Sequence, residues 1–182
     1  MGYEDLRSVL GAVSGRMVAV DTPPALLGRI GFLDDVPVTS RMIFHSRPSG
    51  LRRTVKALAR LGLTDVTVLY GSTSGLALAR RSVDVLVCPY PPVGQTDLMR
   101  SMRRTAGVLV PDGILVMHGV VRRNPLGWMV HAFCIIARKD GGIPSELEIT
   151  SWTLRAGFNR IVRLPRGRGL PHTVIQAHKR VL

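Results

Sequence analysis

Residues 83–118 read VDVLVCPYPPVGQTDLMRSMRRTAGVLVPDGILVMH, and this stretch decides the fold class. The apolar run at 83–88 predicts a buried strand, and the run ILVMH at 114–118 predicts another. Residues 95–106 predict an amphipathic helix whose apolar side chains face inward and whose arginines face outward. The turn PDG at 111–113 then leads into the second strand. Strands that alternate with a helix in this way indicate a mainly parallel sheet.

The same alternation continues toward both ends of the chain. Further strands are predicted at residues 16–20, 41–45, 65–71, 159–164 and 172–178. Helices are predicted at residues 23–31, 50–62, 125–138 and 145–157, with a short helix or turn at 73–81. The last two strands have no room for a crossover helix between them, so they are expected to pair antiparallel. The predicted fold class is therefore α/β: a Rossmann-like, doubly wound, mainly parallel seven-stranded sheet with a C-terminal antiparallel hairpin, in a single domain over residues 1–182.

Two local patterns support these assignments. The sequence SELE at 145–148 fits a capping box, in which Ser145 is the N-cap and Glu148 stands at the third helical position. The helix at 50–62 has apolar residues at helical spacing at positions 51, 55, 58 and 61.

The composition is that of a globular and strongly basic protein. Hydrophobic residues make up 46% and charged residues 20% of 182 residues, and the formal net charge is +13. The excess lies in residues 41–182, which carry 22 Lys or Arg against seven Asp or Glu. Such a surface predicts an anionic partner, namely an acidic protein surface, nucleic acid or anionic lipid. The alternative is an arginine-rich composition with solvated side chains, which is the interpretation favoured for the stripe of Arg52, Lys56 and Arg60.

Cysteine usage and hydropathy point to a cytoplasmic protein. Cys88 and Cys134 lie in apolar runs and are expected to be buried small hydrophobes. No cluster of His, Cys or acidic residues has metal-ligand spacing, so no metal site is predicted. The acidic start has no signal-peptide pattern, and the longest uncharged apolar stretch, residues 124–137, is shorter than the roughly 20 residues of a spanning helix. Peripheral contact with a membrane or a large assembly stays open.

Three segments carry a resemblance to a known family. SVDVLVC at 82–88 and LMRSMRRTAGVLVPDGILVMHGVV at 98–121 resemble the fourth strand, helix and fifth strand of class I S-adenosylmethionine-dependent methyltransferases. SELEITSWTLRAGFNRIVRL at 145–164 resembles a segment common in small-molecule O-methyltransferases. The resemblance covers about residues 49–182. It implies the strand order 3-2-1-4-5-7-6, S-adenosylmethionine as cofactor, and a ligand crevice beyond the carboxyl ends of the strands.

The cofactor loop of that family departs from its usual pattern in this chain. The family loop reads roughly Asp/Glu-x-Gly-x-Gly-x-Gly, whereas residues 21–27 here read DTPPALL. The acid matches, none of the three glycines does, and the prolines have no N–H to donate. In this register the second strand ends at residues 44–46, FHS, without an acid for the ribose. A second register makes Asp21 the ribose ligand after the second strand, but it leaves the run at 41–45 surplus. In either register, one part of the family's cofactor-binding site is missing from this sequence.

Candidate ligand residues follow from the resemblance. Those for the cofactor are Asp21, Thr22, His45, Gly71, Ser72 and Tyr90. Asp21 can instead cap the following helix, and the turn at 71–74 can be a plain polar turn. Tyr90 lies in CPYPP at 88–92, which weakly resembles an Asn/Asp-Pro-Pro-aromatic motif of amino-methylating relatives and can equally form a rigid loop.

Histidine and arginine residues give the remaining candidates. His118 ends the fifth strand and is the candidate catalytic base, with a structural histidine as the alternative. His131 lies on an apolar helix and is expected in the core. The candidate anion-binding residues flank the expected crevice and are Arg122, Arg123, Arg166 and Arg168.

Two main functions are compatible with these features. In the first, favoured by the proline-filled loop, the chain is a degenerate, non-catalytic methyltransferase-like protein that serves as a basic binding or structural subunit of a larger assembly. In the second, it is an active S-adenosylmethionine-dependent methyltransferase acting on a small-molecule hydroxyl or amine. A plain RNA-binding protein is the weakest hypothesis, because aromatic residues are only 5% and no stacking motif is present.

Overall fold

A computed structural model describes most of the chain. The described residues are 15–20, 38–45, 48–62, 66–71, 78–89, 98–122, 125–136, 142–163 and 172–180. Their strands are β1 (Gly15–Val20), β2 (Val38–His45), β3 (Val66–Tyr70), β4 (Val83–Pro89), β5 (Leu109–Val120), β6 (Phe158–Arg163) and β7 (His172–Lys179). Their helices are α3 (Pro48–Leu61), α4 (Leu98–Val108), α5 (Pro125–Ile136) and α6 (Glu146–Arg155). The helix expected at 23–31 lies outside the described residues, as does most of the short helix or turn expected at 73–81.

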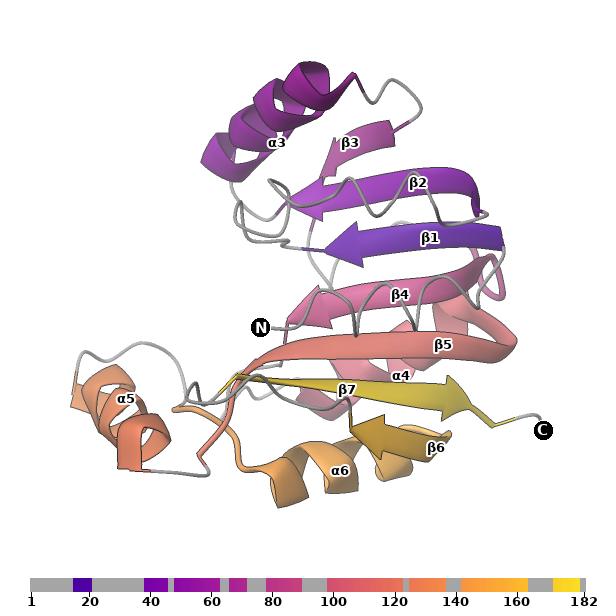
Figure 1. Cartoon of the computed structure of the whole chain (residues 1–182). Helices are drawn as coiled ribbons and strands as arrows, with labels where there is room; N and C mark the ends of the chain where they lie inside the picture. The colour runs from indigo at the N-terminus through magenta and orange to yellow at the C-terminus, as the bar shows by residue number, and fades with distance from the viewer. Residues whose placement is uncertain are drawn as a thin grey trace.

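The strands form one mixed sheet in the order β3-β2-β1-β4-β5-β7-β6. The pairs from β3 to β5 are parallel, whereas β7 is antiparallel to both β5 and β6. This is the strand order that the family resemblance implied, including the antiparallel hairpin at the end of the chain. Because the parallel strands run in one direction, their carboxyl ends share one edge, on the left of Figure 1, which we call the carboxyl edge. The opposite edge is the amino edge.

The helices pack on different parts of the sheet. Helix α4 lies behind β5 (Figure 1) and also contacts α6, whereas α3 packs on β2 and β3 at the other end of the sheet. The buried side chains of α3 are Thr54 and Leu58, four residues apart on one face, while Val55 is half-exposed. The apolar spacing therefore predicted the helix and the burial of Leu58, but not the burial of Thr54 in place of Val55. The reason is that β3, on which α3 packs, is itself a largely exposed edge strand.

The core lies around β4, β5 and β7. Leu86, Leu115, Met117, Ile149 and Phe158 are fully buried there. Strands that are covered on both faces read as continuous apolar runs, which is why the runs at 83–88 and 114–118 predicted β4 and β5. Cys88 is buried, as expected.

Two sequence signals correspond to features of the structure, and the first is confirmed in atomic detail. Helix α6 begins with the expected capping box, in which the Ser145 hydroxyl accepts from the Glu148 amide and the Glu148 carboxylate accepts from the Ser145 amide. The turn expected at 111–113 is a register shift inside β5, which begins at Leu109 and not at residue 114: Val83 pairs with Leu109, and Val85 pairs with Ile114. A Cβ atom at Gly113 would lie 2.9 Å from the Val110 carbonyl oxygen, so the turn has room only for glycine.

Candidate functional site

The carboxyl edge gathers the candidate residues that the structure describes. His45 is the last residue of β2, Gly71 follows β3, His118 lies near the end of β5, and Arg122 follows that strand. The other candidates, namely Asp21, Thr22, Ser72, Tyr90, Arg123, Arg166 and Arg168, lie outside the described residues, and their roles stay predictions.

His118 is buried within the sheet. Its exposed fraction is 4%, and its backbone stands beside Pro89 of β4 and Val174 of β7. Strand β5 continues for two residues beyond it, so His118 lies slightly inside the edge rather than at its rim.

Gly71 is covered by an aromatic ring. A Cβ atom at Gly71 would lie 2.9 Å from Cδ1 of Phe44, the penultimate residue of β2, and Phe44 is itself buried. The absence of a side chain at Gly71 therefore makes room for the phenyl ring between the ends of β2 and β3. The backbone of β2 then ends at His45, and Phe44 and His45 offer no carboxylate at this position.

Arg122 is engaged in a network of side chains, which we call the Arg122 cluster. One guanidinium nitrogen, Nη2, donates to Oε2 of Glu148 at 2.5 Å, and the guanidinium lies 5.2 Å from the ring centre of Trp128. The other, Nη1, lies 3.4 Å from Nε2 of His131. His131 in turn accepts a hydrogen bond at Nδ1 from the Ile143 amide at 2.9 Å. The cluster ties α5 to the start of α6 and to the segment after β5.

The same carboxylate serves the cluster and the capping box. Burial raises the pKa of Glu148, but hydrogen bonds from the Ser145 amide, the Ser145 hydroxyl and Arg122, with the charge of Arg122, lower it further, so that the pKa lies below its usual value. Glu148 is thus ionised at neutral pH and fixes the guanidinium. Arg122 was expected to bind an external anion, and the structure gives it an internal carboxylate partner.

Helix α5 presents an unusual surface. It contains no charged residue, yet Trp128, Met129, Phe133 and Ile135 are each more than half exposed. Gly127 is buried and His131 is half-buried, so these two positions, four residues apart, face the rest of the protein. In Figure 1 the helix stands beyond the carboxyl edge, away from the sheet. Helices that are apolar all round are normally covered, and exposed apolar patches mark interaction sites. The sequence predicted this helix but placed His131 in the core, because periodicity does not show which neighbour covers a helix.

Two further properties concern the described residues alone. No three His, Cys, Asp or Glu side chains among them are arranged to hold a metal ion. None of their helices combines the length and apolar character required to cross a bilayer.

Comparison with known proteins identifies the fold. No protein-family model matches the sequence. A search of curated proteins likewise finds no significant match. Solved structures do match. The mitomycin 7-O-methyltransferase MmcR has a TM-score of 0.77 and 19% identity, over 97% of this chain and 53% of its own length.

Two other structures match over most of both chains. A Haloferax volcanii protein solved in complex with the Trm112 methyltransferase activator has a TM-score of 0.76 and 14% identity, over 98% of this chain and 90% of its own. An S-adenosylmethionine-dependent methyltransferase from Thermotoga maritima has a TM-score of 0.71 and 18% identity, over 98% and 88% of the two chains. At these identities the likeness establishes the fold.

Proposed function

Because the chain has the fold of the class I S-adenosylmethionine-dependent methyltransferases, we propose that it is a binding subunit that does not turn over this cofactor. The observation that carries the proposal is the chemistry at the carboxyl ends of β1 and β2, where this fold places its cofactor. The sequence after β1 is Asp21-Thr22-Pro23-Pro24, and β2 ends in Phe44-His45. This donor set does not fit S-adenosylmethionine, because it lacks the glycines, the amide donors and the second acid.

The surface of the chain supports a role in binding. Helix α5 offers Met129 and Phe133, which are 68% and 65% exposed, at the edge where the fold binds its ligands. Among the described residues, the Arg122 cluster contacts this helix through Trp128 and His131. A helix with exposed apolar side chains suits a partner in a larger assembly, and a protein of similar fold is known in complex with the Trm112 activator. The basic charge of the chain further favours a partner that is acidic.

Calorimetric titration with S-adenosylmethionine tests the proposal. We expect no binding heat at about millimolar cofactor, a concentration at which even a weak site would fill. Micromolar binding would refute the proposal. The matched variant restores the family loop by changing Pro23, Ala25 and Leu27 to glycine. If the loop chemistry is the cause, this variant gains affinity for the cofactor, whereas a single Leu27→Gly control does not.

The alternative function is an active methyltransferase acting on a small hydroxyl or amine. Its specific support is His118, a histidine that is buried near the carboxyl edge. In that case His118 would accept the proton of the acceptor hydroxyl. A His118→Gln variant would then retain cofactor binding and lose turnover. The calorimetric titration with S-adenosylmethionine also tests this alternative, because a chain that binds no cofactor cannot transfer its methyl group.

A further inference from the structure

A basic pocket lies at the amino edge, on the opposite side of the sheet from α5. It has a volume of about 280 Å³ and four cationic lining residues, Arg80, Arg81, Lys179 and Arg180. Arg80 and Arg81 precede β4, while Lys179 ends the antiparallel strand β7 and Arg180 follows it. The sheet order brings these two pairs together although about a hundred residues separate them in the sequence. Gly107 at the end of α4 and Gly157 after α6 complete the wall.

Main-chain hydrogen bonds build the pocket. The Arg81 amide donates to the Gly107 carbonyl at 3.1 Å, and the Arg180 amide donates to the Gly157 carbonyl at 3.0 Å. Carbonyls at helix ends attract cations, and a basic side chain is often held there for that reason alone. Here main-chain amides satisfy these carbonyls. The Lys179 ammonium group donates one hydrogen bond to the Leu109 carbonyl oxygen, at 2.5 Å. An ammonium group has three donors, so this bond leaves two for a ligand.

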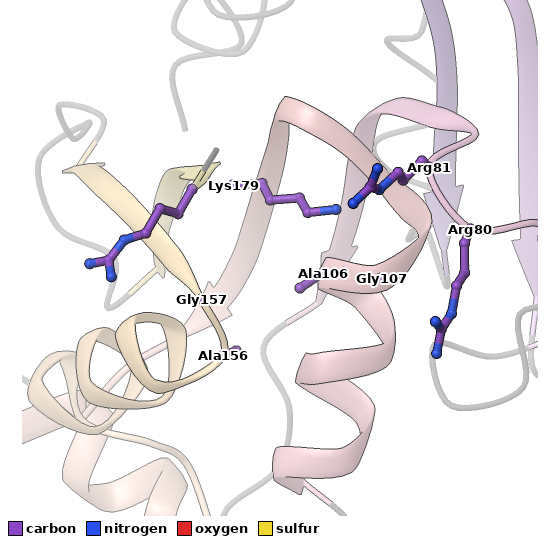
Figure 2. A pocket seen from close by; sticks show the side chains of 8 residues that line it. Arg80, Arg81, Ala106, Gly107, Ala156, Gly157 and Lys179 are labelled. Carbon is purple, nitrogen blue, oxygen red and sulfur yellow. The ribbon is translucent and has the colours of Figure 1, made fainter. Parts of the chain in front are cut away.

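Like charges converge in the pocket. Figure 2 shows the Lys179 ammonium and the Arg81 guanidinium pointing toward each other, while Arg80 extends on the other side of the end of α4. Burial and, second, the charge of Arg81 lower the pKa of Lys179 below its usual value. Two cations at close approach repel each other unless an anion lies between them.

The described residues provide no carboxylate that could lie between Arg81 and Lys179. Only four acidic side chains lie among them. Asp84 accepts from the Arg16 amide, Glu146 pairs with Arg163, and Glu148 pairs with Arg122. The fourth, Asp112, is exposed in the turn that begins β5 and is not part of the pocket wall.

The pocket also has open space for a ligand. A Cβ atom built at Gly107 would meet no atom within 4 Å, and the same holds at Gly157. The rest of the wall consists of alanine, so the pocket has no aromatic ring or apolar slot to hold a base or a lipid chain. Its volume and charge suit a compact, multiply charged anion.

We infer that the amino-edge pocket binds a di- or triphosphate group between Arg81 and Lys179, with Arg80 and Arg180 on its rim. Guanidinium forks match phosphate oxygens, and the ammonium adds a point charge. The group can belong to free polyphosphate or to a nucleotide, since both present the same chain of phosphate oxygens. Binding at this pocket does not depend on whether the chain binds S-adenosylmethionine, because the pocket lies at the opposite edge from the carboxyl ends of β1 and β2. It gives the anionic partner expected from the charge a defined binding position.

Titration of the intact chain with inorganic tripolyphosphate tests the inference. The wild type is expected to bind, with affinity falling as salt rises. Each charge-assisted hydrogen bond to phosphate contributes roughly tenfold in affinity, so R81Q should lose about tenfold and R81Q/K179Q about a hundredfold. A second variant, G107L, fills the pocket while keeping every charge and should lose at least about tenfold. Because R81Q leaves the Lys179–Leu109 bond intact, it separates lost binding from lost folding, and thermal unfolding of each variant confirms this.

The matched control is R52Q/K56Q on α3. It removes the same formal charge from exposed positions at the far end of the sheet and should change affinity by no more than about twofold. Equal losses in the control and in R81Q/K179Q, or full binding by G107L, would overturn the inference by showing adsorption to a generally basic surface. Absence of tripolyphosphate binding by the wild type would overturn it as well.

Two further ligands identify the source of the phosphate. ATP tests a nucleotide, and a single-stranded RNA without a terminal phosphate tests a phosphodiester chain. Pocket-dependent binding of ATP and not of the RNA assigns the site to a di- or triphosphate. Pocket-dependent binding of the RNA would overturn the inference, because that strand carries no such group. The R81Q/K179Q variant should give the same result as the wild type when it is titrated with S-adenosylmethionine. If the chain does bind this cofactor, the proposed function fails, but the tripolyphosphate result at the amino-edge pocket still stands.

Discussion

Among the polar residues at the carboxyl edge, Glu148 is expected to contribute most to the stability of the fold. The substitution Glu148→Ala tests this contribution. Its Oε2 atom accepts from the Ser145 amide at 2.7 Å, from the Ser145 hydroxyl at 2.7 Å and from Arg122 at 2.5 Å. A charge-assisted hydrogen bond contributes about 1.5–3 kcal/mol, and a neutral one about 1 kcal/mol. The Arg122 and Glu148 side chains are 18% and 35% exposed, so screening by water moves the total toward the lower end.

The free energy of unfolding should therefore fall by about 2 kcal/mol in Glu148→Ala. For a chain of this size, that corresponds to a decrease in Tm of roughly 4–8 °C. Urea unfolding followed by circular dichroism measures the change, and an unchanged m value confirms that the loss is one of stability. The matched control is Glu146→Ala in the same helical turn. Glu146 pairs with Arg163, which is 53% exposed, at 2.9 Å, so its loss should cost about 1 kcal/mol or less.

The pH dependence gives an independent test of the same residue. Because the pKa of Glu148 is lowered on folding, the unfolded chain binds more protons near that pKa, and stability falls as the pH decreases. The difference between wild type and Glu148→Gln should be constant above the usual pKa of 4.5 and should shrink below it. A cost of less than about 0.5 kcal/mol, or a difference independent of pH, would refute the role given to this carboxylate.

Three further outcomes are expected. Gly113→Ala places a Cβ atom 2.9 Å from the Val110 carbonyl oxygen, so it should lower stability by about 1–3 kcal/mol in thermal unfolding. The pKa of Lys179 is lowered by burial and by Arg81, so wild type should gain stability relative to Lys179→Met as the pH rises toward about 10.4, measured by urea unfolding at each pH. Replacing Met129 and Phe133 by serine should reduce binding of a hydrophobic dye and leave stability within about 0.5 kcal/mol, because both side chains are exposed.

Local signals explain what the sequence predicted correctly. Strands β4 and β5 are buried on both faces, so their apolar runs identified them without any knowledge of neighbours. The capping box is a contact between residues three apart, and its two residue types suffice to predict it. The strand order followed from the family resemblance, since no local feature of the sequence determines which strands become neighbours.

Non-local packing explains the rest. Thr54 rather than Val55 is buried in α3, because the face that a helix buries depends on where it meets the sheet. The exposure of α5 depends on the absence of a covering element within the described residues, which its composition cannot show. The basic pocket joins Arg81 to Lys179 through the order β4-β5-β7. No local pattern in the sequence shows that these two cations meet, and ligands of this fold are expected at the carboxyl edge, so the pocket at the amino edge was not predicted.

The two candidate surfaces differ in chemistry as well as in position. At the carboxyl edge, α5 offers apolar side chains and Arg122 is neutralised by Glu148, so binding there would depend on desolvation and only weakly on salt. At the amino edge, Arg81 and Lys179 face each other across open space, so binding there would fall steeply as salt rises. A partner that covers α5 leaves the amino-edge pocket accessible, because the sheet separates them (Figure 1). Salt titration of each binding event therefore assigns it to one edge without any substitution in the chain.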